Sequence, residues 1–144
     1  MYLDGQGVDS NTEQALFWLK KAALSGNPEY EYFYGVIYAI GKFVPQSYKV
    51  ASIWFEKAAG KGHAIAASML GWVYLKGSVV DFERRNFNAY VWLQLALSLG
   101  HNYELVVGNL MRSEGYLSAE EKKEAMDLVK IKMMKINDGK TNTR

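Results

Sequence analysis

A short pattern of glycine, alanine and tryptophan returns every 36 to 38 residues, and this recurrence constrains the fold more than any other feature of the sequence. Trp18, Trp54 and Trp92 are separated by 36 and 38 residues. Steps of the same size separate two series of glycines and one of alanines, namely Gly5, Gly41 and Gly77, then Gly26, Gly62 and Gly100, and finally Ala15, Ala51 and Ala89. A fixed period of this size is typical of stacked supersecondary units that contact only their neighbours. The sequence therefore predicts a repeat protein and favours binding over catalysis.

Each unit is predicted to contain two helices joined by a turn. In the clearest unit, residues 27–62, Pro28 suits the first turn of a helix, where a missing N–H costs nothing. Tyr34 and Tyr38 lie one helical turn apart, and Gly41 is expected to end this helix in a left-handed cap. The rest of the unit repeats an apolar stripe at helical spacing, which predicts a second helix.

Two small residues are expected where the helices of a pair approach each other closely. Gly35 on the first helix and Ala51 on the second would let the axes come within the usual distance of about 8–10 Å. A single pair cannot bury its apolar faces, so it must stack against further pairs. We therefore expect the tryptophans and tyrosines to fill the gaps between successive pairs.

The predicted fold is an all-α solenoid, a superhelix of antiparallel helix pairs that a C-terminal helix caps. Ser118 to Glu121 form a capping box that starts this last helix, and its many lysines are expected to face water. One domain is expected over residues 1–137, followed by a polar tail at 138–144. Within the domain we expect a partial unit, two full units, a divergent partial unit and the capping helix, at residues 1–26, 27–62, 63–100, 101–113 and 118–137.

The residue pattern resembles the Sel-one-like repeat, a relative of the tetratricopeptide repeat, over residues 1–113. The resemblance is carried by two strings, Leu70, Gly71, Tyr74, Gly77, Ala89, Trp92, Ala96 and Gly100, and Tyr2, Gly5, Gly7, Val8, Ala15, Trp18, Lys21, Ala22, Ala23 and Gly26. It implies a non-enzymatic adaptor or scaffold, because members of this family assemble protein complexes and some bacterial ones bind effectors or signalling proteins. In related superhelices the first helices of the units line a concave face, so a protein or peptide is expected to bind there.

The candidate partner-binding residues are those on the first helices that the repeat itself does not need, together with one arginine in an inserted loop at residues 78–88. They are Phe33, Ile37, Ile40, Met69, Trp72, Val73, Lys76 and Arg84. Solvent-facing aromatic and methionine side chains on neighbouring helices suit a protein-binding groove. The alternative is that these residues pack against further repeats, against the loop or against a second copy, so self-association through exposed repeat ends stays open.

Composition and spacing argue against several other function classes. The net charge of +2 is too small to predict a nucleic-acid partner or an anionic membrane surface. No stretch approaches the roughly 20 apolar residues of a membrane span, and the absence of cysteine excludes disulfides and thiolate chemistry. His63 and His101 lie one unit apart, so structural roles at the turns are expected rather than a metal site or a catalytic pair. We therefore expect no enzyme, catalytic residue, metal or cofactor.

Two further alternatives remain open at this point. An immunity or inhibitor protein that neutralises an effector enzyme would also use a groove, but it would inhibit its target tightly and stoichiometrically. The absence of cysteine favours the cytoplasm for the chain as given. An upstream segment with a targeting signal would instead place it in the periplasm or outside the cell, since the sequence starts within a repeat unit.

Overall fold

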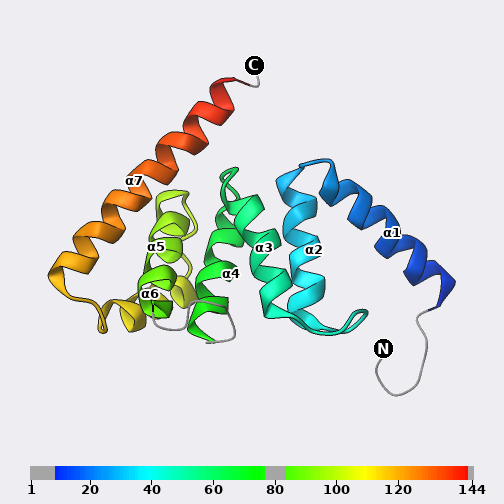
Figure 1. The fold of residues 1–144 in the computed structure, drawn as a ribbon, viewed down its shortest axis with the longest axis horizontal. Helices are drawn as coiled ribbons and strands as arrows, with labels where there is room; N and C mark the ends of the chain where they lie inside the picture. The colour runs from blue at the N-terminus through cyan, green and yellow to red at the C-terminus, as the bar shows by residue number, and fades with distance from the viewer. Residues whose placement is uncertain (1–8, 77–83, 143–144) are drawn as a thin grey trace.

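The structure is a computed structural model that describes residues 9–76 and 84–142. Every regular element in these residues is an α-helix, which confirms the predicted fold class. The helices follow one another along an elongated molecule, from α1 at one end to α5 and α6 near the other, and α7 runs diagonally past α5 (Figure 1). The described helices are α1 (Ser10–Leu24), α2 (Pro28–Ile40), α3 (Tyr48–Ala59), α4 (Ala64–Leu75), α5 (Arg85–Ser98), α6 (Glu104–Glu114) and α7 (Ala119–Thr141).

Local signals at the helix ends behave as the sequence predicts. Asn27 caps α2 through its side chain, and Pro28 occupies the first turn of that helix. Gly41 has a φ of +70° and ends α2 in a left-handed conformation. Ser118 and Glu121 each bond the other's backbone N–H, at 3.1 and 2.8 Å, and so form the capping box that begins α7.

Close contact within a helix pair depends on one glycine in each first helix. A Cβ atom at Gly35 of α2 would lie 2.8 Å from the Phe55 ring of α3. A Cβ atom at Gly71 of α4 would lie 2.6 Å from the Leu93 side chain of α5. These distances are too short for carbon atoms, so only glycine lets the two helices of each pair pack at this spacing. The predicted close approach at Gly35 is confirmed.

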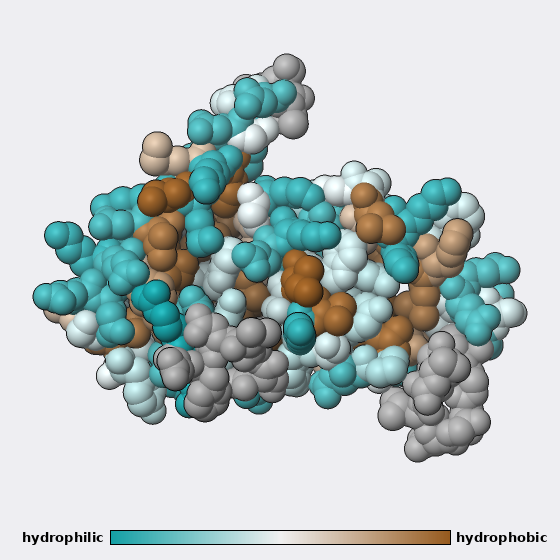
Figure 2. All heavy atoms as spheres, in the orientation of Figure 1, coloured by the Kyte–Doolittle hydropathy of each residue, from teal (hydrophilic) through white to brown (hydrophobic). Residues whose placement is uncertain are grey.

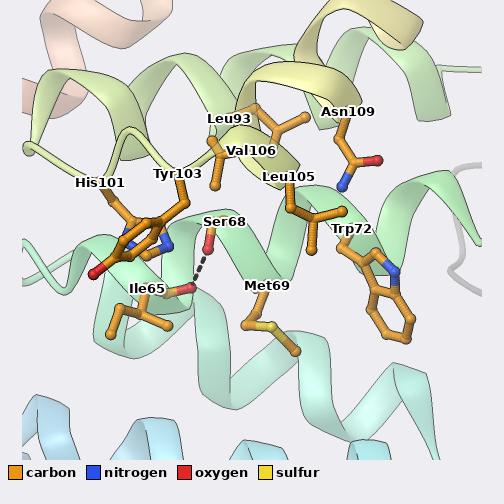
Figure 3. A pocket seen from close by; sticks show the side chains of 10 residues that line it. All are labelled: Ile65, Ser68, Met69, Trp72, Leu93, His101, Tyr103, Leu105, Val106 and Asn109. Carbon is orange, nitrogen blue, oxygen red and sulfur yellow. Dashed lines mark hydrogen bonds between the residues drawn. The ribbon is translucent and has the colours of Figure 1, made fainter.

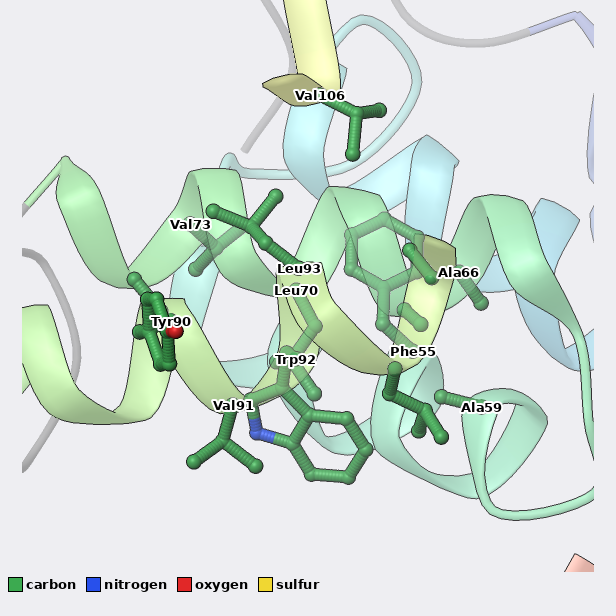
Figure 4. Close-up of a cluster of buried hydrophobic side chains, with 14 of the residues drawn as sticks. Phe55, Ala59, Ala66, Leu70, Val73, Tyr90, Val91, Trp92, Leu93 and Val106 are labelled. Atoms are coloured by element: carbon green, nitrogen blue, oxygen red, sulfur yellow. The ribbon is translucent and has the colours of Figure 1, made fainter. Parts of the chain in front are cut away.

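The main hydrophobic core lies between α3, α4 and α5. Phe55, Leu70, Val73 and Leu93 are completely buried there, and Val106 of α6 extends the cluster at one end (Figure 4). This arrangement buries apolar side chains both within a pair and between successive pairs, as a stacked repeat requires.

The C-terminal helix α7 covers one side of the stack by packing against α5. Its residues Ala125, Val129 and Ile136 are buried. The ammonium of Lys132 lies 4.1 Å from the ring centre of Trp92, which α7 thereby shields. Burial lowers the pKa of Lys132, and the nearby Glu56 opposes that change. The predicted capping helix is therefore confirmed.

The expected burial of the three repeated tryptophans is correct only in part. Trp92 is buried, and Trp54 is partly buried with its ring edge-on to Tyr34. Trp18, however, is 60% exposed, so the prediction is wrong for this residue. Its helix, α1, packs against α2 but has no first helix of its own among the described residues. The equivalent small residue Ala15 is exposed for the same reason.

Helix α7 continues to Thr141, so residues 138–141, which the sequence predicts to lie in a polar tail, are helical and exposed. Ile136 is buried against the turn between α3 and α4, where a Cβ atom at Gly62 would lie 3.0 Å from the isoleucine side chain. This contact fixes the last turns of the helix. The Asn142 backbone N–H bonds to the carbonyl of Asp138 and continues the helical pattern.

Candidate protein-binding surface

A groove with an apolar lining lies between the first helices α4 and α6 on the described surface. Its volume is about 250 Å³. Along the groove, His101 and Tyr103 lie with Ile65 at one end, and Asn109 lies near Trp72 at the other (Figure 3). We call this feature the α4–α6 groove, and its lining consists of Ile65, Ser68, Met69, Trp72, Leu93, His101, Tyr103, Leu105, Val106 and Asn109.

The α4–α6 groove carries little polar character. The Ser68 hydroxyl donates to the Ile65 carbonyl at 2.8 Å, so this group is already bonded within α4 (Figure 3). Burial, and to a lesser extent the charge of His63, lowers the pKa of His101 below its usual value. The lowered pKa favours the neutral imidazole at pH 7, and the ring lies edge-on to Tyr103 at 4.7 Å. The groove thus offers an apolar, formally uncharged lining.

The predicted residues Met69 and Trp72 both line this groove, and each is partly buried. The Trp72 ring lies edge-on to Tyr48 of α3 at 5.6 Å, which fixes its orientation. The ammonium of Lys76 lies 5.1 Å from the ring centre of Trp72. The predicted Met69, Trp72 and Lys76 therefore gather along one edge of α4.

The prediction for Val73 is wrong, because its side chain is completely buried in the core. Helix α4 is packed against both α3 and α5, so most of its circumference is covered. The α4 residues that line the groove are Ile65, Ser68, Met69 and Trp72, which recur at i, i+3, i+4 and i+7 on one face of the helix. Val73 lies outside this face and cannot contact a partner.

The predicted residues of α2 lie outside the groove. Phe33 and Ile40 are 45% and 64% exposed. Ile37 instead lines a second cavity of about 360 Å³ between α1 and α2, beside Leu16 and Phe43. The structure therefore separates the α2 candidates from those of α4. On the side of the molecule shown in Figure 2, apolar side chains form several separate patches among hydrophilic ones.

Arg84 does not line the groove either. Its guanidinium lies 3.2 Å from the Glu124 carboxylate of α7 and stacks over Phe87 at 4.0 Å. These contacts link the start of α5 to the capping helix. They explain the position of the Arg84 side chain without invoking a binding partner. The preceding part of the inserted loop, residues 78–83, lies outside the described residues.

Sequence reasoning missed the residues that α6 and the turn before it contribute. Tyr103 and Leu105 are 68% and 72% exposed at the rim, and Asn109 is 9% exposed beside them. This segment diverges from the repeat, so repeat matching attached no role to it. A usable signal was nevertheless present, because Asn109 stands 38 residues after Gly71, the step that separates Gly62 from Gly100.

Both ring nitrogens of His63 have hydrogen-bond partners. His63 Nδ1 accepts a hydrogen bond from the Ala66 backbone N–H at 3.1 Å and so caps α4. Its Nε2 therefore carries the proton and donates to Glu29 at 3.0 Å, while the ring stacks on Tyr32 at 4.7 Å. Within residues 9–76 and 84–142, no group of three or more His, Asp or Glu side chains could hold a metal ion.

None of the described helices is long and apolar enough to cross a membrane.

Three consecutive stretches, residues 1–27, 28–63 and 64–101, match the Sel1 repeat. The chain belongs to the Sel1 repeat family. Proteins with Sel1 repeats generally mediate protein–protein interactions, and they are typically non-catalytic scaffolds.

A solved structure supports the same fold for this Sel1 repeat protein. It is the crystal structure of c5321, described as a protective antigen present in uropathogenic Escherichia coli strains and displaying an SLR fold. The two proteins share 28% sequence identity and superpose with a TM-score of 0.77 over 90% of this chain. The match spans 27% of the length of c5321.

Proposed function

We propose that this Sel1 repeat protein is a non-enzymatic adaptor that binds a protein or peptide on the concave face formed by the first helices, with the α4–α6 groove as its main contact site. The observation that carries this proposal is the groove itself. It combines an apolar cavity with exposed apolar side chains, Tyr103 and Leu105, at its rim. Such a combination is typical of surfaces that bind other molecules.

Trp72 and Met69 have the chemistry of binding hot spots. Large aromatic side chains held in a fixed orientation lose little conformational entropy when a partner covers them. Trp72 has that restraint from Tyr48, whereas the flexible Met69 can adapt to the shape of an incoming side chain. Exposed Leu105 would add apolar area at the rim.

Site-specific photo-crosslinking tests this function. A benzophenone amino acid is placed at Leu105, on the groove rim, or at Leu24, which has a similar exposure on α1. We expect the protein carrying the probe at 105 to form a discrete crosslinked complex in cells of the source organism. The probe at 24 should not form that complex.

The identified partner then allows a quantitative measurement. Trp72→Ala should weaken its binding by about 2 kcal/mol, or roughly 30-fold in Kd, when measured by calorimetry. Leu24→Ala serves as the matched surface control and should leave Kd unchanged. Equal crosslinking from both positions, or a Trp72→Ala protein that folds and binds normally, would contradict the proposed surface.

A further inference from the structure

Asn109 is a buried polar residue in an otherwise apolar groove. It is only 9% exposed, and its side-chain amide makes no hydrogen bond to any residue within 9–76 and 84–142. Figure 3 shows the amide at the end of the groove near Trp72 and Leu105. Its amide atoms are not among the fully buried, unpaired side-chain atoms of the described residues, so they are open to solvent in the groove. The amide of Asn109 is therefore available to a ligand.

The repeat stack does not need a polar side chain at this position. Gly35 and Gly71 occupy the equivalent position in α2 and α4, where each lies against the second helix of its own pair. Helix α6 is followed by α7, which packs against α5. The close approach that requires glycine in the complete pairs is thus absent at Asn109, and a side chain that can bind a ligand takes its place.

We propose that the α4–α6 groove binds a peptide segment in an extended conformation, with one apolar side chain in the cavity and a neighbouring backbone peptide group hydrogen-bonded to the Asn109 amide. This inference rests on the proposed function and specifies the ligand of the same site. A primary amide carries donors and an acceptor side by side, which is the complement of a peptide group. An extended segment presents such groups unpaired, as in other modes of strand recognition.

A helical ligand fits these groups less well. In the interior of a helix the backbone N–H and C=O groups are already bonded to one another. A helix lying in the groove would therefore cover Asn109 without offering it a backbone partner, and an unpaired buried amide weakens binding. The helix-in-groove mode is the alternative that the experiment below must separate from the extended one.

The cavity also limits the chemistry of the bound side chain. A volume of about 250 Å³ is below the range of about 300–1,000 Å³ that small-molecule and cofactor sites occupy, so it suits one or two side chains. The lining offers no formal charge at neutral pH to pair with an ionised side chain. We therefore expect leucine, methionine, phenylalanine or another uncharged apolar residue as the anchor.

Two displayed peptide libraries provide the probes. One consists of random linear 12-residue peptides, and the other of peptides held helical by a side-chain staple; both are selected on the wild-type chain. Selected peptides are resynthesised, and Kd is measured for wild type, Asn109→Leu and Trp72→Ala. Asn109→Leu keeps the size of the side chain and removes its hydrogen-bonding groups. Asn137→Leu, at an exposed site on α7, is the matched control.

The expected result is that linear peptides bind the groove and that Asn109→Leu, but not Asn137→Leu, weakens their binding at least tenfold. N-methylation of one peptide backbone nitrogen, or replacement of one amide by an ester, should cause a similar loss with wild type and little further loss with Asn109→Leu. In wild type, the NMR signal of the Asn109 side-chain amide should shift on binding. This NMR measurement uses the wild-type protein, so it does not depend on whether the Asn109→Leu protein folds.

Two outcomes would overturn the inference. They differ in whether the groove is still supported as the binding site. Binders that are helical, or that lose affinity with Trp72→Ala but not with Asn109→Leu, would overturn the extended mode while supporting the groove as the binding site. Binders that no substitution in the groove affects, with an unshifted Asn109 signal, would overturn both the extended mode and the proposed surface.

Discussion

Single glycines set the distance between the two helices of each pair. At Gly71, a Cβ atom would meet the Leu93 side chain at 2.6 Å and the Ala89 carbonyl oxygen at 3.2 Å. Gly108 lies in the interior of α6 and has no atom within 4 Å of a Cβ position. The two glycines are both helical, so they differ mainly in what surrounds them.

We expect Gly71→Ala to lower the free energy of unfolding by about 1–3 kcal/mol, because the added methyl forces α4 and α5 apart. Gly108→Ala should instead leave stability unchanged or raise it by up to about 1 kcal/mol, since alanine favours the helix. Urea denaturation followed by circular dichroism measures both values. Equal effects of the two substitutions would show that the close contact at Gly71 does not limit the helix spacing.

The lowered pKa of His101 makes stability depend on pH near neutrality. Burial is the main cause of the lowering, and the charge of His63 adds to it. The unfolded chain therefore binds a proton at His101 more readily than the folded protein does. The stabilising contribution is complete above the usual pKa of about 6.5 and is lost as pH falls through that value toward the lowered folded one.

We expect the free energy of unfolding to fall between about pH 7.5 and 5.5, and His101→Gln to reduce that fall. Denaturation at several pH values in this range measures the slope. Asp9 and Glu121, whose carboxyl pKa values are lowered by backbone hydrogen bonds, contribute only at more acidic pH. An unchanged slope in the His101→Gln protein would assign the pH dependence to other groups.

At the scale of elements, α7 stabilises the stack through one buried face and leaves the other face in water. Two isoleucines on this helix make the contrast measurable. Ile136 is 3% exposed and lies against the turn at Gly62, whereas Ile131 is 48% exposed. The contribution of the capping helix should therefore depend on which of its faces is changed.

We expect Ile136→Ala to destabilise the protein by about 2–4 kcal/mol through lost burial and a new cavity. Ile131→Ala should cost less than about 0.5 kcal/mol, as for other exposed positions. Chemical denaturation compares the two variants with wild type. A small effect of Ile136→Ala would mean that the last turns of α7 are not docked on the turn between α3 and α4.

The sequence predicted those elements whose signals are local. Pro28, Gly41 and the Ser118 capping box start or end helices through residues close to them in the sequence. Their roles can therefore be inferred without knowing the neighbouring helices. The small size of Gly35 and Ala51 on the two predicted helices of a unit likewise predicted the close approach at Gly35. Fold class and the nature of the helix pairs follow from such patterns.

Burial on a given face could not be inferred in the same way. Val73 and Trp18 have similar apolar character, but one lies under two neighbouring helices and the other on a helix that lacks a pair partner among the described residues. Periodicity predicts which residues share a face, and only the arrangement of helices decides whether that face is covered. The groove was missed for this reason, since half of its lining comes from the divergent α6 and the turn before it.

At the scale of the whole molecule, packing is uneven along the stack. Helices α4 and α5 hold most of the fully buried side chains, whereas α1 buries only Ala23 and exposes Phe17 and Trp18. In a repeat protein each unit contributes its own stability and the interface with its neighbours. The first unit, of which the structure describes only α1, should therefore open more readily than the centre of the stack at α4 and α5.

Native-state hydrogen exchange can resolve this gradient. Amides of α1 should exchange through local opening at a free energy well below that of global unfolding, whereas amides of α4 and α5 should exchange only when the whole chain unfolds. The distinction follows from the packing of α1 within residues 9–76 and 84–142, where its main helix contact is with α2. Helices α4 and α5, in contrast, contact each other as well as α3, α6 and α7. Small amounts of urea should accelerate exchange in α4 and α5 much more than in α1, because global unfolding exposes more surface than local opening. Uniform protection and urea dependence along all helices would instead indicate one cooperative unit, in which the exposed face of α1 carries no energetic disadvantage.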